Sequence, residues 1–348
     1  MAVERILVCE AQTPFVTGGA EYLVRSLVQQ LVGHGYQASV VSLPFKPYPK
    51  EGILPHAAAW RLLDLSESNG ESVDLLITTK FPTYFARHSN KVSWLVHQHR
   101  SAYELCGTEF SDFHHTELDV GLREQLIALD GQMLRESRQL FTIAQNTSNR
   151  LKTFNGLSSE PLYHPPRLAD QLKSGVYGDY ILSVGRLEAI KRTHLLVKAM
   201  QWVDSPIRLV VVGEGTQRAA LEALAAKTGV ADRIEFRGAA DDGDLVALYE
   251  SALGVAYVPY DEDYGYVTLE AFLARRPVVT AVDSGGTLEF VEDGVNGLVC
   301  EPEPEAIATH INRVGADRSL ASSLGAAGFE RARQVTWDGV VDKLVGIA

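Results

Sequence analysis

Two glutamates eight residues apart, Glu262 and Glu270, flank a loop that contains Gly265. The apolar residues after this loop predict that a helix begins at the glycine, and the free amides at a helix start bind anions. Glu262 would then lie in the loop. Glu270 would lie about one turn inside the helix, where its carboxylate could accept hydrogen bonds from a sugar diol. Taken alone, such a pair is more simply explained as two surface glutamates.

Two cations lie at a second glycine turn. Gly185 ends an apolar run and is followed by Arg186 and, five positions later, by Lys191. Glycine lets a ligand approach the backbone closely. Arginine binds phosphate through a planar fork and lysine as a point charge, so both could reach one diphosphate. The alternative is a turn at a strand end with two solvated cations.

Two further turns, Gly213-Glu214-Gly215 and Ser284-Gly285-Gly286, also follow apolar runs. Neither completes the G-x-G-x-x-G pattern that binds a dinucleotide. A nicotinamide-dependent enzyme is therefore poorly supported, and we expect no cofactor.

Two histidines, His97 and His99, directly follow the apolar residues 92–96. His97 is the better ligand candidate, and His99 is either structural or a ligand contact. No carboxylate or cysteine lies near them at the spacing of a zinc site, so no metal is expected. The weaker candidates of this half are Lys80 and Asp112, and the pair His114-His115 is interpreted as surface.

The composition indicates an ordinary globular protein. Of 348 residues, 46 % are hydrophobic and 22 % charged, and this length suits two domains. The net charge of -12 disfavours nucleic acid as a partner. Peripheral membrane contact stays open, because an acidic protein can still carry a local basic patch. Three scattered cysteines indicate a reducing compartment. The first apolar run is interpreted as a strand rather than a signal peptide, so a cytoplasmic location is expected.

Short apolar runs alternate with longer segments of helical periodicity, a pattern typical of βαβ units and buried parallel strands. In one such segment, residues 21–32, the apolar side chains fall on one helical face. The strands are predicted at residues 6–9, 38–43, 73–78, 92–96, 140–143, 180–184, 207–212, 234–236, 254–258, 277–281 and 297–300.

The two series of strands predict an α/β protein with two doubly wound, Rossmann-like domains. Residues 155–178 are rich in glycine and proline and are interpreted as the linker between them. The first domain is predicted over residues 1–165 and the second over 166–335. A cleft between two such domains is the default place for a ligand.

In their order along the chain, these motifs resemble the retaining family 4 glycosyltransferases of the GT-B fold, and the resemblance covers nearly the whole sequence. Gly18-Gly19-Ala20-Glu21 looks like that family's N-terminal glycine loop and helix. The turn from Gly185 to Lys191 looks like its phosphate-binding element, and Glu262 with Glu270 matches its E-x7-E signature. Residues 283–289 and 293–297 match its closing segments. The resemblance also implies that a C-terminal helix, residues 336–348, crosses back onto the first domain.

The resemblance implies a role for each matching residue of the second domain. Arg186 and Lys191, at the Gly185 turn, would bind the diphosphate of a nucleotide-sugar donor. Glu270 would bind the ribose hydroxyls, and Glu262 the hydroxyls of the donor sugar. The amides that assist Glu262 would be those of Tyr264, Gly265, Tyr266 and Val267.

In the first domain, Gly18 and Gly19 would face the donor phosphates and the acceptor. His97 would face the donor sugar, while His99 and Lys80 are weaker acceptor contacts. The predicted catalytic residues are His97, Arg186, Lys191 and Glu262. The sequence departs from the usual family pattern at three positions, which leaves the donor sugar open: Asp263, Tyr264 and Tyr260.

The expected function is thus a retaining, metal-independent hexosyltransferase in carbohydrate biosynthesis. It would use a UDP- or GDP-sugar, with UDP slightly preferred, and a glycan, lipid-linked or small-molecule acceptor. The oligomeric state is left open. Two alternatives remain: a non-catalytic nucleotide-sugar-binding subunit, or another GT-B enzyme such as an epimerase or phosphorylase.

Overall fold

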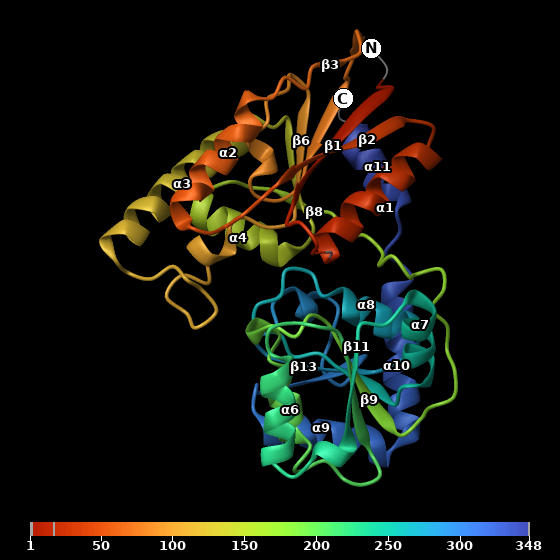
Figure 1. Cartoon of the computed structure of the whole chain (residues 1–348). Coiled ribbons are helices and arrows are strands. Elements are labelled where there is room, and N and C mark those ends of the chain that lie inside the picture. The colour runs from red at the N-terminus through yellow and green to blue at the C-terminus, as the bar shows by residue number, and fades with distance from the viewer. Residues whose placement is uncertain (1–2, 17, 347–348) are drawn as a thin grey trace. The chain divides into compact units, whose positions relative to one another are not determined.

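A computed structural model describes residues 3–16 and 18–346 of the chain. The chain divides into two compact units. Unit 1 comprises Met1–His164 and Thr336–Ala348, and unit 2 comprises Pro165–Val335. Each unit is an α/β layer structure built on one six-stranded sheet (Figure 1). No helix among the described residues is long and apolar enough to cross a membrane.

The sheet of unit 1 is parallel throughout, in the order β2-β1-β5-β6-β7-β8. Its strands are β1 (Arg5–Gln12), β2 (Gln37–Pro44), β5 (Leu75–Thr78), β6 (Lys91–Leu95), β7 (Gln139–Thr142) and β8 (Glu160–Pro161). A small hairpin, β3 (Glu67–Ser68) and β4 (Glu71–Ser72), precedes β5. The sequence predicts β1, β5, β6 and β7 to within about two residues at most ends, but not β8 or the hairpin.

One expectation for this sheet is wrong. Residues 38–43 are predicted as a strand buried on both faces, yet every residue of β2 is half-buried or exposed. The reason is position, because β2 lies at the edge of the sheet and pairs with β1 alone. Apolar composition therefore overstates burial at a sheet edge.

Helices cover both faces of this sheet (Figure 1). Helices α2 (Ile53–Leu62), α3 (Glu117–Arg135) and α4 (Gln145–Asn155) lie together on one face, and α1 (Gly19–Gly33) with α11 (Asp338–Val345) on the other. Helix α11 buries Val340, Val341 and Leu344 in unit 1. Just before it, the Trp337 ring packs 6.1 Å from the ring of Trp94 and 5.7 Å from that of His164.

Unit 2 has the order β11-β10-β9-β12-β13-β14, again parallel throughout. This is the strand order of the Rossmann fold, in which the chain reverses direction across the sheet between β9 and β12. Ligands of such sheets bind outside the carboxyl ends of the strands at that reversal. The strands are β9 (Tyr180–Val184), β10 (Arg208–Val212), β11 (Ile234–Gly238), β12 (Gly254–Ala256), β13 (Val278–Ala281) and β14 (Gly297–Cys300).

Two groups of helices flank this sheet. Helix α5 packs against α6 and α9, and helix α8 packs against α10. Their bounds are α5 (Thr193–Ala199), α6 (Arg218–Lys227), α7 (Asp242–Ser251), α8 (Tyr266–Leu273), α9 (Pro304–Ala316) and α10 (Arg318–Ala332). The core between them is aliphatic and includes Ile181, Leu209 and Leu298, each with no exposed surface.

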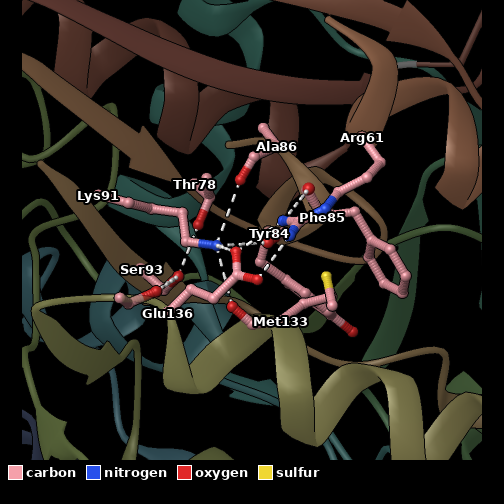
Figure 2. Close-up of polar contacts among 10 residues, drawn as sticks. Arg61, Thr78, Tyr84, Phe85, Ala86, Lys91, Ser93, Met133 and Glu136 are labelled. Atoms are coloured by element: carbon pink, nitrogen blue, oxygen red, sulfur yellow. Dashed lines mark hydrogen bonds and ion pairs between the residues drawn. The ribbon is translucent and has the colours of Figure 1, made fainter. Parts of the chain in front are cut away.

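Unit 1 also buries charge. Lys91, the first residue of β6, has no exposed surface, and its ammonium donates to the carbonyl oxygens of Tyr84 (2.9 Å), Ala86 (3.2 Å) and Met133 (2.9 Å) (Figure 2). Met133 lies in the last turn of α3, where the helix dipole favours a cation. Glu136, which follows that helix, completes the cage 3.4 Å from the ammonium. Lys91 therefore ties the sheet to α3 and to the turn at residues 83–85.

Glu136 is itself held by Arg61 of α2, through two hydrogen bonds of 2.6 and 2.7 Å (Figure 2). Burial lowers the pKa of Lys91, and the charge of Glu136 acts in the opposite direction. The three carbonyl oxygens and the carboxylate replace the water that the buried ammonium has lost, as a buried charge requires.

A second buried group lies on α3 about one turn before Met133. The Tyr103 hydroxyl donates to Asp130 of α3 at 2.6 Å, and Asp130 has no exposed surface. Burial raises the pKa of this carboxyl to about 7, although the Tyr103 hydrogen bond lowers it. Asp130 is therefore largely protonated below neutral pH in the folded protein and ionised in the unfolded chain.

This difference predicts a pH-dependent stability. Between the ordinary carboxyl pKa and about 7, the folded state binds the extra proton, so Asp130 lowers stability as pH rises. The free energy of unfolding of the wild type should fall relative to Asp130→Asn by about 2–3 kcal/mol from pH 5 to pH 8. Denaturant unfolding at both pH values measures this. Parallel pH profiles of the two proteins would show that Asp130 titrates normally.

Candidate functional site

The loop after β9 carries the first predicted motif. Gly185 has a positive φ of 148°, and its N–H donates to Val212 at the end of β10 at 3.0 Å. Two residues later, Leu187 donates to Glu214 at 2.9 Å, so the turns after β9 and β10 run side by side. A side chain at Gly213 would overlap the Gly185 carbonyl. Gly213 and Gly215, which resemble part of a dinucleotide motif, therefore allow the two turns to pack against each other.

Arg186 and Lys191 differ in their surroundings. Arg186 is exposed, and no side-chain hydrogen bond or ion pair holds it among the described residues. Lys191 ends a short 3-10 turn, Ala189–Lys191, and its side chain is 18 % exposed. Its ammonium pairs with the Glu262 carboxylate and lies 3.3 Å from the Tyr257 hydroxyl. The structure therefore brings Lys191 to Glu262 and leaves Arg186 in solvent.

Glu262 lies in the loop after β12, and a buried tyrosine fixes its side chain. The Tyr257 hydroxyl donates to the Oε2 atom of Glu262 at 2.8 Å. Burial, with the Glu262 charge second, raises the pKa of Tyr257 well above its usual value, so the hydroxyl keeps its proton. The backbone of Glu262 is held as well, because its carbonyl accepts from the N–H of Gly286 at 2.7 Å.

Helix α8 begins where the sequence predicts. Gly265 is its N-cap with φ 84°, and a Cβ there would lie 2.7 Å from the Thr287 hydroxyl oxygen. The hydroxyl oxygens of Thr268 and Thr287 are buried without a hydrogen-bond partner. The helix start thus combines the first backbone amides of α8, those of Tyr266 and Val267, with two nearby unpaired hydroxyls. Such a group of donors is suited to an anion.

Tyr264 does not lie free in the loop before this helix. It is 2 % exposed and packs its ring 5.1 Å from that of Tyr266 and 5.3 Å from that of Phe290. Its side chain therefore supports the loop rather than facing a ligand.

Glu270 lies in the middle of α8, and the residue is 8 % exposed. The Tyr249 hydroxyl of α7 donates to its Oε2 atom at 2.8 Å. Burial raises the pKa of Glu270, whereas the Tyr249 hydrogen bond and the charge of Arg167 lower it. Arg167 is paired with Asp242 at the start of α7. Glu270 is therefore a buried acceptor held in one orientation.

Sequence reasoning missed the residue that anchors this region. Arg192 follows Lys191, and its guanidinium donates to the carbonyls of Val258 and Pro259, each at 2.9 Å. It also binds Asp283 through two hydrogen bonds, of 2.8 and 2.6 Å. Arg192 thus joins the loops after β9, β12 and β13. The available signal was an arginine beside Lys191 and an aspartate directly after an apolar strand.

In unit 1, the predicted glycine loop is held by an ion pair. Gly18 donates its N–H to Oε2 of Glu21 at 2.9 Å, which caps the start of α1. Oε1 of Glu21 accepts from the Lys80 ammonium at 2.6 Å. The side chains of this ion pair are 14 % exposed for Lys80 and 7 % for Glu21. The Lys80 ammonium, predicted as a weak acceptor contact, is thus bound to Glu21 in the structure. Gly19 is the first residue of the helix.

The two strand-end histidines also differ. His99 lies among the rings of Phe45, Phe81 and Phe113, and burial lowers its pKa to about 4. It is therefore neutral at pH 7, in keeping with the structural alternative. His97 is half-buried, and its Nδ1 lies 2.7 Å from the Gln98 carbonyl. The other histidines considered, His114 and His115, are exposed, as is Asp112.

No cluster of three or more His, Cys, Asp or Glu side chains suited to a metal ion occurs within residues 3–16 and 18–346. In unit 2, the carboxyl ends of β9 and β12 and the start of α8 together present a cation, two oriented carboxylates and the first amides of a helix. This arrangement can bind an anion beside a polyhydroxylated group.

Comparisons with known proteins bear on both units. Residues 169–331 match the family model described as glycosyl transferases group 1. An uncharacterised glycosyltransferase of Methanocaldococcus jannaschii is 25 % identical over 96 % of this chain and 95 % of its own length. A D-inositol 3-phosphate glycosyltransferase of Xylanimonas cellulosilytica is 32 % identical, but the match covers 49 % of this chain and 42 % of that protein.

Two solved structures match almost the whole chain. Sucrose-phosphate synthase from Thermosynechococcus elongatus has a TM-score of 0.77 at 19 % identity, with 98 % of this chain and 97 % of that one covered. HepE of Anabaena, in complex with UDP and glucose, has a TM-score of 0.72 at 18 % identity, with 99 % and 98 % covered. This confirms the predicted GT-B fold, and the family match with the named relatives supports a glycosyltransferase.

Proposed function

We propose that this chain transfers a hexose-type sugar from a nucleoside-diphosphate sugar held in unit 2. The observation that supports it most is the meeting of Lys191, Glu262 and the start of α8 beside the carboxyl end of β12. A cation and the amides at a helix start suit a diphosphate, and an oriented carboxylate suits sugar hydroxyls. Glu270, one helical turn further on, would bind the ribose diol.

The donor sites follow from these contacts. Lys191 and the amides of Tyr266 and Val267 would bind the diphosphate. Arg186 is exposed in the structure and would join them when the ligand is bound. Glu262 would accept hydrogen bonds from the donor sugar. In unit 1, Gly18, Gly19 and His97 keep their predicted roles as contacts of the donor phosphates and sugar.

The reaction we propose retains the anomeric configuration. The bond between the anomeric carbon and the diphosphate oxygen breaks, the acceptor oxygen attacks from the same face, and its proton passes to the departing phosphate. Negative charge then accumulates on the distal phosphate, where Lys191 and the helix amides stabilise it. Among the described residues of unit 2, the nearby carboxylates Glu262 and Glu270 are already held by other side chains and serve binding rather than nucleophilic attack.

A UDP-sugar is slightly preferred over a GDP-sugar, in line with the UDP bound to the structural neighbour HepE. The acceptor would be a glycan, a lipid-linked sugar or a small molecule. A cytoplasmic enzyme, with peripheral contact at the inner face of a membrane left open, fits this chemistry.

Nucleotide binding tests the proposal directly. A ligand at 100 times its dissociation constant adds about 2.7 kcal/mol to folding stability, so UDP or GDP should raise the melting temperature. Glu270→Ala should weaken this binding about tenfold or more, because its carboxylate binds the ribose in the ground state as well as in the transition state. Glu222→Ala, an exposed glutamate on α6, is the matched control. The proposal fails if no nucleotide shifts the wild type, and nucleotide binding without multiple-turnover transfer would indicate a sensor.

Metal dependence gives a second test. Cationic side chains and helix amides would neutralise the diphosphate, so sugar transfer should keep its rate in excess EDTA. The measurement is initial rate with and without chelator. Loss of activity that Mn²⁺ or Mg²⁺ restores would refute the metal-independent part of the proposal.

A further inference from the structure

Each of the two glutamates of the proposed donor site is held by its own buried tyrosine. Tyr257, just after β12, donates to Oε2 of Glu262, and Tyr249 of α7 donates to Oε2 of Glu270, both at 2.8 Å. The two tyrosines are 6 % and 0 % exposed. Neither belongs to the sequence motif that predicts the glutamates.

We propose that Tyr249 and Tyr257 are positioning residues with separate tasks, Tyr249 for nucleotide binding and Tyr257 for the donor sugar. The proposal rests on the proposed function. Each tyrosine would act through its glutamate without touching the donor.

The chemistry of the contact explains the division. A phenol O–H donates one hydrogen bond, and a carboxylate acceptor makes that bond charge-assisted and short. Fixing one carboxylate oxygen of a flexible glutamate leaves the other oriented for a ligand hydroxyl. The glutamate side chain then loses its conformational freedom when the protein folds, so that less entropy is lost when the ligand binds.

Tyr257 has an additional task because its glutamate is shared. Lys191 pairs with Glu262 and also lies within reach of the Tyr257 hydroxyl. A diphosphate that attracts Lys191 would loosen that ion pair. Tyr257 would then be the contact that keeps Glu262 in place while the lysine turns to the phosphate.

Tyr249 has a different environment, in which several charges act on Glu270. Arg167 from the segment before β9 lowers the pKa of Glu270, and Asp242 of α7 raises it. Tyr257 and Tyr266 are close enough for their own pKa values to respond to Glu270. Removing the Tyr249 hydroxyl should raise the pKa of Glu270 further, and the acid limb of nucleotide binding should move to higher pH.

The experiment compares Tyr249→Phe and Tyr257→Phe with Tyr177→Phe. The Tyr177 hydroxyl donates to the backbone carbonyl of Arg275 in the same unit and contacts neither glutamate. Calorimetry measures the dissociation constants of UDP and UDP-glucose, or of GDP and GDP-mannose if the melting experiment selects guanine. Melting curves check that each phenylalanine variant keeps its fold.

Tyr249→Phe should weaken both ligands equally, by about tenfold, the scale of one charge-assisted hydrogen bond. Tyr257→Phe should weaken the nucleotide sugar by a similar factor and leave the free diphosphate within about twofold. Tyr177→Phe should change neither, and only Tyr249→Phe should shift the pH profile. In double-variant cycles with Glu270→Gln and Glu262→Gln, each pair should lose no more affinity than its worse single variant.

Two results would separate the inference from the function on which it rests. If the Gln variants weaken binding while the Phe variants match Tyr177→Phe, the tyrosines are structural and the proposed function stands. If neither Gln variant affects either ligand, the donor site itself is misplaced.

Discussion

Lys191→Ala should lower kcat/KM by roughly 10²–10³, the scale for losing one preorganised stabiliser of transition-state charge. The reason lies in the position of the ammonium beside Glu262 and near the start of α8, where the diphosphate is proposed to depart. Because charge on the phosphate grows during the reaction, the loss should appear mainly in kcat. Steady-state kinetics of sugar transfer measure it.

The structure changes one premise of this prediction. From the sequence, Lys191 is expected as an exposed cation whose loss leaves stability untouched, but its side chain is 18 % exposed and paired with Glu262. Removal of the lysine side chain deprives the Glu262 carboxylate of its ion pair and leaves it the hydrogen bond from Tyr257. We therefore expect some loss of stability together with the loss of rate. Melting curves on the same protein separate the two effects. Lys227→Ala, an exposed lysine at the end of α6, is the control, and near-normal turnover of folded Lys191→Ala would show that the site is wrong.

Lys91→Met should lower the free energy of unfolding of unit 1 by about 3–5 kcal/mol, the scale for several buried acceptors that lose their donor. Methionine fills the volume, but the carbonyl oxygens of Tyr84, Ala86 and Met133 lose the ammonium as a donor. Glu136 keeps its two hydrogen bonds from Arg61. An unsatisfied buried acceptor costs about 1–3 kcal/mol, so several together outweigh the gain from removing a desolvated ammonium. Denaturant unfolding, followed by tryptophan fluorescence, is the measurement.

The fluorescence reports mainly on unit 1, which holds Trp60, Trp94 and Trp337, whereas Trp202 lies in unit 2. Lys343→Met provides the comparison, since that lysine makes a half-exposed ion pair with Glu160 in the same unit. An exposed pair contributes at most about 1 kcal/mol. Equal stability of the two variants would mean that the cage around Lys91 relaxes at no cost.

Local patterns were sufficient to predict the strands of unit 2 and the start of α8. Strand β9 and strand β14 have the predicted bounds because short apolar runs bounded by glycine and charged residues leave few alternatives. Gly265 fixes the helix start through a backbone conformation that other residues rarely adopt. The glutamates were found by their spacing, which is likewise local.

What the sequence could not show is the set of contacts between distant segments. Tyr249 lies 21 residues from Glu270, and Lys80 lies 59 residues from Glu21. Nothing in the neighbourhood of such a tyrosine or lysine along the chain indicates its partner. Lys91 is a similar case, because a lysine at the start of a strand is usually solvated, and only the packed α3 makes it buried.

The contact between the rings of His164 and Trp337 joins the two places where the chain leaves and re-enters unit 1. In topological terms, unit 2 (residues 165–335) is a continuous insertion into unit 1, which is the discontinuous host domain. Because these two rings are in contact, the backbones that carry them are separated by no more than the reach of two side chains. A linker of a few residues at about 3.3–3.6 Å each is therefore long enough to join His164 to Thr336. The host could thus be rebuilt as one short polypeptide and the insertion produced separately, so that the chemistry assigned to each half could be studied by mixing the two.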